Sequence, residues 1–313
     1  MMLERWKLPH ILKGMLTGVP LINAWRLRRA STGGTDNPRY CYSVWLRHLV
    51  TLVPHGFHIK GARIGEFGPG DSVGTGLAAL LSGAEHYVGL DLLPLSARAN
   101  LGSILDELVR LYSRKEPIPD SSEFPRMRPQ LESYQFPDHA IDWTGFRERV
   151  ERIRGEIVRG LGHGPMVTYR APWISITEVA PNSLDLFFSQ AVLEYAVPLE
   201  DAYRAMSTWL KPGGYSSHTI NFSATYLSPF WNGHWAYSDW EWRLARGRRE
   251  VFLNREPLNA HLGYARGFGF EVLLLNRDYS SSGLKVEELS PRFRTLNSED
   301  LRTRGVMVVL RKR

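Results

Sequence analysis

The stretch RIGEFGPGDSVGTGLA, which begins at Arg63, has an acid two residues before a run of glycines, between two apolar segments. Gly68 and Gly70 predict a tight turn from a strand into a helix, where the backbone can approach a ligand closely. The dinucleotide pattern G-x-G-x-x-G would need a third glycine where this chain has Val73. A carboxylate at Glu66 would repel a pyrophosphate but attract a cation. The turn therefore favours a cationic ligand that carries no phosphate.

A second acid, Asp91, ends the next strand-like run, EHYVGLD. A carboxylate in this place suits a bidentate hydrogen bond to ribose hydroxyls. S-adenosylmethionine carries an ammonium and a sulfonium and has no phosphate, so it matches both acids. The two acids at this spacing therefore favour S-adenosylmethionine as the cofactor.

Three segments in this order resemble the class I S-adenosylmethionine-dependent methyltransferases, above all those that act on small molecules: EFGPGDSVGTG, YVGLD and SLDLFFSQAVLEYAVPLEDAYRAMSTWLKPGG. The resemblance covers residues 60–222 well and the last strands more loosely. It implies that Asp91 binds the ribose hydroxyls and that the end of the fourth strand lines the methionine side of the cofactor. The residues implied in cofactor binding are Glu66, Gly68, Gly70, Asp91, Ser189 and Gln190.

Two positions depart from the family pattern. Ser72 replaces the last glycine of the motif acid-x-Gly-x-Gly-x-Gly, so we expect a slightly altered turn. Tyr195 stands where related enzymes often have a histidine, which argues against a histidine-based role there. The LKPGG segment, from Leu210 to Gly214, matches a structural turn between a helix and a strand.

Strand-like and helix-like runs alternate from about residue 61, which predicts a parallel sheet. With the resemblance, this predicts an α/β fold: a Rossmann-like, seven-stranded, mostly parallel sheet with helices on both faces and a final antiparallel strand. We expect an N-terminal helical region at 1–60 and a methyltransferase domain at 61–313. Prolines interrupt 114–145, and aromatic and arginine residues crowd 223–257, so both segments are predicted to be insertions, lid-like in form.

The second insertion is where we expect the acceptor. Its tryptophans and tyrosines could form a wall against the apolar face of a sugar. His234 within it and His218 on the preceding strand are candidate general bases, and no ligand spacing predicts a metal site. NGHWAYSDWEWRL, LNREPLNAHL and YCYSVWLRHL also resemble methyltransferases of bacterial surface-polysaccharide biosynthesis. This implies O-methylation of a sugar hydroxyl, on a small molecule or on a lipid- or nucleotide-linked carrier.

Charge and cysteine content bear on the partners and the cellular location of the protein. The chain has 39 Lys and Arg against 32 Asp and Glu, a formal +7, which permits an anionic partner without selecting one. Cys41 is the single cysteine, so no intrachain disulfide forms and a reducing, cytoplasmic location is the simpler prediction. The basic N-terminal segment is too short and too interrupted to span a bilayer but could rest on an anionic membrane. A helical lid or dimer element would also explain it.

Other functions remain open at this stage. An RNA methyltransferase would use the basic surface, although SQAVLEY lacks the Pro-Pro-aromatic element of many nucleic-acid amino-methyltransferases, which disfavours a nucleic-acid partner. A nicotinamide-dependent oxidoreductase is disfavoured by Val73. A non-catalytic module that binds S-adenosylmethionine is the alternative from a different class.

Overall fold

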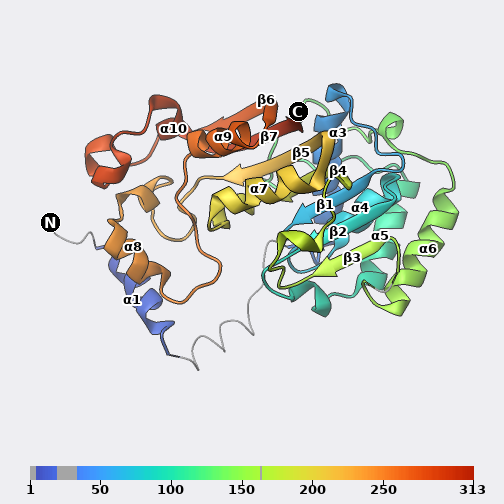
Figure 1. The fold of residues 1–313 in the computed structure, drawn as a ribbon, viewed down its shortest axis with the longest axis horizontal. Helices are drawn as coiled ribbons and strands as arrows, with labels where there is room; N and C mark the ends of the chain where they lie inside the picture. Colours follow the sequence, from blue (N-terminus) through green and yellow to red (C-terminus); the bar gives the residue numbers. More distant parts are fainter. Residues whose placement is uncertain (1–4, 20–33, 163) are drawn as a thin grey trace.

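The computed structural model describes residues 5–19, 34–162 and 164–313, and Figure 1 shows their arrangement. Seven strands form one sheet in the order β3-β2-β1-β4-β5-β7-β6. All neighbouring pairs are parallel except those that β7 makes with β5 and β6. The strands are β1 (Arg63–Phe67), β2 (His86–Leu90), β3 (Val167–Arg170), β4 (Leu184–Gln190), β5 (Leu210–Asn221), β6 (Phe270–Tyr279) and β7 (Thr303–Lys312). The predicted fold class is confirmed.

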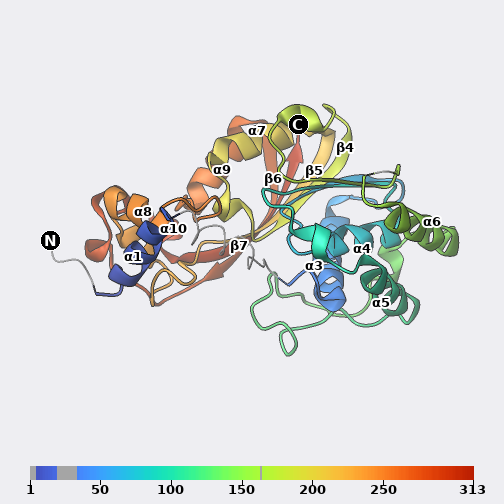
Figure 2. The ribbon, with the colours of Figure 1, turned by 90° about the horizontal axis from the view of Figure 1, so that it is seen from below.

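Helices cover both faces of this sheet. One face carries α3, α4, α5 and α6, and the opposite face carries α7 and α9, as Figure 2 shows with the sheet nearly edge-on. We call these the α3 face and the α7 face. The helices are α1 (Leu8–Leu16), α3 (Pro38–Leu52), α4 (Gly74–Ser82), α5 (Leu101–Ser113), α6 (Phe146–Arg159), α7 (Leu199–Trp209), α8 (Asp239–Arg246), α9 (Leu258–Gly267) and α10 (Ser298–Arg302).

The core follows the alternation of side chains along each strand. In β4, Leu186 and Phe188 point to the α3 face, whereas Phe187 points to the α7 face and packs on Trp209 of α7. Because both faces are covered, most residues of the central strands β1 and β4 are buried.

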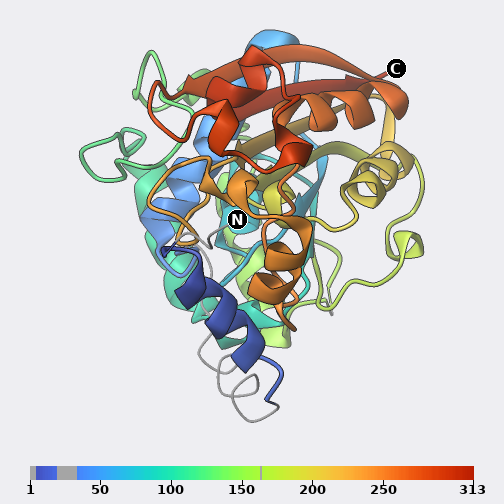
Figure 3. The same cartoon turned by 90° about the vertical axis from the view of Figure 1, so that its left-hand side faces the viewer.

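The two predicted insertions differ in structure. Residues 114–145 hold one short 3-10 helix, Asp138–Ala140, and otherwise irregular backbone, as the prolines predict. Residues 223–257 contain α8, which packs against α1. Figures 1 and 3 show α1 and α8 side by side at one end of the molecule, away from β3 and α6.

The segment LKPGG differs from its prediction. It belongs to β5, which begins at Leu210 and pairs there with Leu184 before the register shifts. Gly213 takes a φ of 78° inside this irregular stretch. The helix-to-strand change is therefore made by an irregular strand start and not by a separate turn.

Candidate functional site

The carboxyl ends of β1, β2 and β4 meet where the strand order changes direction, between β1 and β4. Open α/β sheets bind ligands at such a switch point. Phe67, the last residue of β1, pairs with Leu90 of β2 and Ser189 of β4. The residues that follow each strand therefore lie at one edge of the sheet.

Glu66 projects to the α3 face and is almost completely buried. Its carboxylate accepts a hydrogen bond of 2.5 Å from the Tyr87 hydroxyl. Tyr87 fits there because α4 carries Gly76, where a Cβ would overlap the tyrosine ring. Burial raises the pKa of Glu66 to about 8. The hydrogen bond from Tyr87 opposes this rise, and the negative charge of Asp91 adds to it. A cation beside Glu66 would favour the ionised form.

The glycine turn follows β1 with two residues in the left-handed region: Gly68 has a φ of 64° and Gly70 a φ of 74°. Asp91 holds this turn, because its Oδ2 accepts the Gly70 N–H at 3.0 Å. Its Oδ1 accepts N–H groups of its own loop, from Leu92 and Leu93. A carboxylate has about four acceptor positions, so Asp91 can still accept a ligand hydroxyl.

Ser72, the departure from the family glycine, is fully buried and has a structural role. Its hydroxyl donates to the Thr35 carbonyl and accepts the Gly74 N–H at 2.9 Å, where α4 begins. The Thr35 hydroxyl donates to the Pro69 carbonyl at 2.8 Å and accepts the Ser72 N–H at 3.0 Å. Thr35 thus fastens the N-terminal region to the glycine turn, a contact that the sequence analysis did not foresee.

Gln190 and Ser189 end β4 on opposite faces. Gln190 shares the α3 face with Glu66, is half-buried, and partly offsets the lowering of the His48 pKa that burial causes. Ser189 is fully buried on the α7 face, and its hydroxyl lies 2.7 Å from Nδ1 of His218. The half-buried position of Gln190 at the end of β4 suits a ligand at the strand ends. The Ser189 hydroxyl already pairs with His218. Contact between Ser189 and the cofactor therefore stays a prediction, and it would have to be made by the main chain.

The two predicted histidine bases lie in closed surroundings. His218 has no exposed surface, both of its ring nitrogens are within hydrogen-bond distance of serine hydroxyls, and burial lowers its pKa. His234 stacks near Trp235 in the short helix Gly233–Ala236, and burial with the Arg255 charge lowers its pKa to about 3. Rings with such low pKa values are weak bases near neutral pH. Their catalytic roles stay predictions that the geometry does not favour.

Glu194 is a candidate site residue that the sequence analysis missed. It lies in the 3-10 helix Leu193–Tyr195 just after β4, is buried, and its Oε2 has no hydrogen-bond partner. Burial raises its pKa to about 8, against backbone hydrogen bonds from Glu194 itself and Asn221. Desolvation and then the charges of Cys41, Glu66 and Glu194 raise the pKa of Tyr40 to about 12. The pKa of Tyr40 therefore responds to the charges of both carboxylates.

A hollow of about 280 Å³ borders the chain just after Glu194. Asn254 joins the two places: its N–H donates to the Glu194 carbonyl, and its side chain donates to Leu193 and Ala196. The lining combines aromatic rings with three arginines. Its residues include Trp242, Arg246, Asn254, Arg255, Tyr264 and Arg292.

Two features, a metal-ligand cluster and a membrane-spanning helix, are absent from the residues that the structure describes. Within 5–19, 34–162 and 164–313, no group of three or more metal-ligating side chains comes together. Over the same ranges, no helix has the length and apolar character needed to cross a bilayer.

Among known proteins, only solved structures are similar to this chain. No protein-family model matches the chain, and no curated protein matches it. An S-adenosylmethionine-dependent methyltransferase from Mesorhizobium loti is 15% identical, with a TM-score of 0.44, over 84% of this chain and 96% of that one. Phosphoethanolamine N-methyltransferase 2 of Haemonchus contortus, in complex with S-adenosyl-L-methionine, is 16% identical, with a TM-score of 0.42, over 86% and 52%. The [4+2]-cyclase SpnF is 15% identical, with a TM-score of 0.40, over 85% and 80%.

At these identities and TM-scores, the neighbours give no ligand or reaction to this chain. Three features at or just after the strand ends bear on the ligand: a buried carboxylate, a second acid on a glycine turn, and a third carboxylate with an unpartnered oxygen.

Proposed function

We propose that the chain is an S-adenosylmethionine-dependent methyltransferase whose cofactor site lies at the carboxyl ends of β1 and β2. The observation that supports this most is the pair of acids at one edge, Glu66 buried against Tyr87 and Asp91 holding the glycine turn. Glu66 suits a cationic group, Asp91 suits hydroxyls, and neither suits a phosphate. The residues present therefore fit this cofactor, which when bound supplies an electrophilic methyl group.

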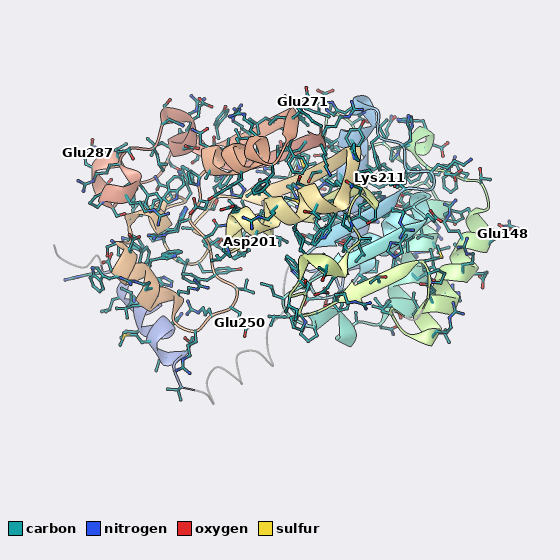
Figure 4. The ribbon with its side chains drawn as sticks, viewed as in Figure 1. Glu148, Asp201, Lys211, Glu250, Glu271 and Glu287 are labelled. Carbon is teal, nitrogen blue, oxygen red and sulfur yellow. The ribbon has the colours of Figure 1, made fainter. Side chains whose placement is uncertain are left out.

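The cofactor assignment is tested by calorimetric titration of the purified protein with S-adenosylmethionine and, separately, with NAD. We expect saturable binding of S-adenosylmethionine, weakened at least tenfold in Asp91→Asn and in Glu66→Gln, since each removes a charge-assisted contact. Glu148→Gln is the matched control, because this glutamate lies exposed on α6, where Figure 4 labels it. Undiminished binding in both site variants, or binding of NAD instead, would overturn the assignment.

The finer proposal is O-methylation of a carbohydrate or another hydroxylated small molecule. A hydroxyl must lose its proton as it attacks a methyl group, so the site needs a base with a pKa near neutrality. Glu194 is buried, has a pKa raised to about 8, and has one unpartnered oxygen. We assign it the role of accepting the hydroxyl proton, in place of His234 and His218.

The hollow that residues 196–199 border, just after Glu194, supports an acceptor that carries a charged group. Trp242 and Tyr264 suit the apolar face of a sugar, and arginines suit a phosphate such as that of a nucleotide- or lipid-linked carrier. Arg292 is already paired with Glu256 and Asp239, and Arg255 with Asp239, which leaves Arg246 as the more available cation in this lining.

Glu194→Gln tests the base. We expect turnover of an acceptor found by screening hydroxylated sugars and sugar nucleotides to fall by a factor of about 10² to 10⁴, with cofactor binding unchanged. In the unchanged protein, kcat/KM should rise with pH up to about 8 and then level off, because the base must be ionised. Equal turnover in Glu194→Gln would exclude this role while leaving the cofactor assignment standing.

A further inference from the structure

Helix α1 turns its most apolar side away from the protein. Its inner side contacts α8 through Ile11 and Gly14. Its outer side carries a stripe at i, i+4, i+7 and i+8 spacing, which Val19 extends by one more position. The stripe consists of Leu8, Leu12, Met15, Leu16 and Val19, each between 44% and 56% exposed. Single exposed leucines are ordinary, but a contiguous stripe of this kind marks a contact surface.

Helix α8, which neighbours α1, carries two further exposed apolar residues. It packs along α1, and the approach is close, because a Cβ at Gly14 would overlap the carbonyls of Leu244 and Ala245. Trp240 and Leu244, one turn apart on α8, are both exposed. We call the stripe on α1 together with these two residues the α1–α8 face; Figure 3 shows the end of the molecule that carries it.

The surroundings of the α1–α8 face are cationic. Residues 5–19 and 239–250 carry five exposed cations: Arg5, Lys13, Arg243, Arg246 and Arg248. They carry two exposed acids, Asp239 and Glu250, and Asp239 is already paired with Arg255. Glu241 is buried and paired with Lys7. An apolar face bordered by cations is the pattern of a helix that lies on an anionic membrane.

The charge argues against a second copy of the chain as the occupant. In a symmetric dimer each copy would present the same cations to the other, which repel. With nine residues, α1 is also too short to span the hydrocarbon core, so it would lie in the plane of the interface. We propose that the α1–α8 face docks the protein on an anionic lipid surface.

Vesicle co-sedimentation of the full chain tests this proposal. The probes are vesicles of phosphatidylcholine alone and of phosphatidylcholine mixed with phosphatidylglycerol. We expect binding to the mixed vesicles only, weakened by salt because exposed charges contribute. Leu12→Glu with Leu16→Glu should reduce binding at least tenfold, since two leucines would no longer enter the interface.

Matched controls lie on α6, at the other end of the molecule. Val158 is an apolar residue there with 82% exposure, so Val158→Glu adds an acid without touching the α1–α8 face. Lys13→Glu with Arg243→Glu should reduce binding in the same direction as the leucine pair, whereas Arg147→Glu with Arg152→Glu on α6 should not. Because all these positions are exposed, thermal melting should show that the variants remain folded.

Three results would overturn the proposal. Failure to bind either vesicle would exclude a lipid-binding face. An equal loss in the α6 controls would show that binding depends on net charge and not on this surface. A concentration-dependent dimer in light scattering that Leu12→Glu with Leu16→Glu dissociates would assign the face to a second copy. None of these results depends on cofactor binding, so the proposal stands or falls separately from the proposed reaction.

Discussion

At the scale of the residue, Glu66 contributes a carboxyl group that the protein keeps largely protonated until a cation arrives. Burial raises its pKa to about 8 despite the hydrogen bond from Tyr87, so much of the unliganded protein holds a neutral acid there at neutral pH. Binding of a cation would stabilise the ionised form and release a proton. The same burial affects stability, because an unfolded chain ionises this side chain near its usual pKa of 4.5.

The sign of the stability effect follows from the two pKa values. Between pH 4.5 and about 8 the unfolded chain binds fewer protons than the folded protein at Glu66. The contribution to the free energy of unfolding is therefore full below pH 4.5 and decreases as the pH rises to about 8, by about 1.4 kcal/mol per pH unit for this one group. Glu66→Gln should flatten the fall of the melting temperature over this range.

Thermal melts at pH 5 to 9 measure this effect. Glu194 stays in the variant and contributes a slope of the same sign, so the difference between the two curves belongs to Glu66 alone. Glu148→Gln, exposed on α6, should reproduce the curve of the unchanged protein. Superimposed curves for Glu66→Gln and the unchanged protein would contradict the raised pKa.

Site residues that belong to a short sequence motif could be predicted from the sequence. Those whose role depends on contacts between distant parts of the chain could not. Glu66 and Asp91 end strands beside a glycine turn, so their place at the sheet edge is fixed by about 30 residues of chain. Glu194 is different. Its importance depends on burial beside Asn221 and Tyr40, which no spacing indicates.

At the scale of the element, the segment from Gly34 to Asn37, just before α3, acts as a clamp on the glycine turn. Thr35 contacts Pro69 and Ser72 with its hydroxyl and Ser72 again with its carbonyl. Asn37 caps α3 by accepting the N–H groups of Arg39 and Tyr40, so the clamp is continuous with a helix of the core. A contact between residue 35 and the turn at 69–72 has no local sequence signal.

Thr35→Val should loosen the clamp. It keeps the shape of the side chain and removes one donor and one acceptor, which leaves the Ser72 N–H without its partner inside the protein. We expect the free energy of unfolding to fall by about 1 to 3 kcal/mol and the affinity for S-adenosylmethionine to fall with it, because the turn that would bind the cofactor becomes less ordered. Thr35→Ser, which keeps the hydroxyl, should restore most of both. Equal affinity in Thr35→Val and in the unchanged protein would show that the turn is ordered without the clamp.

Element prediction succeeded where the pattern was long and periodic. The helix expected from FRERVERIRGEIVRGL is α6, Phe146–Arg159, and the strand expected from SLDLFFSQ is β4. The error at LKPGG has a physical cause: a Pro-Gly-Gly sequence favours a turn, but pairing with β4 extends β5 back to Leu210.

At the scale of the whole molecule, the two large apolar cores lie on the two faces of the sheet, and smaller clusters support the end that carries α1 and α8. The cluster between α1, α8 and residues 252–253 buries seven apolar residues, far fewer than either large core. Few buried contacts give a low free energy of local opening. The end that carries the α1–α8 face is therefore expected to open more readily than the sheet.

Hydrogen exchange measured by mass spectrometry checks this difference. Amides of β1, β4 and β5 should exchange slowest, and those of α1 and α8 substantially faster. Gly14→Ala should accelerate exchange in α1 further, because its Cβ would overlap the backbone of α8, whereas Gly263→Ala on α9 meets nothing within 4 Å and should leave α1 unchanged. Protection of α1 equal to that of the sheet would contradict the ranking.

The single cysteine gives the clamp a chemical reporter. Cys41 is fully buried on α3, its thiol donates to the carbonyl of Thr35, and burial raises its pKa to about 12. A thiol in this state does not react with alkylating reagents. A molecule therefore becomes labelled only when an opening exposes Cys41, and opening of the clamp removes one of the contacts that cover it. Any ligand that orders the glycine turn should slow the alkylation of Cys41.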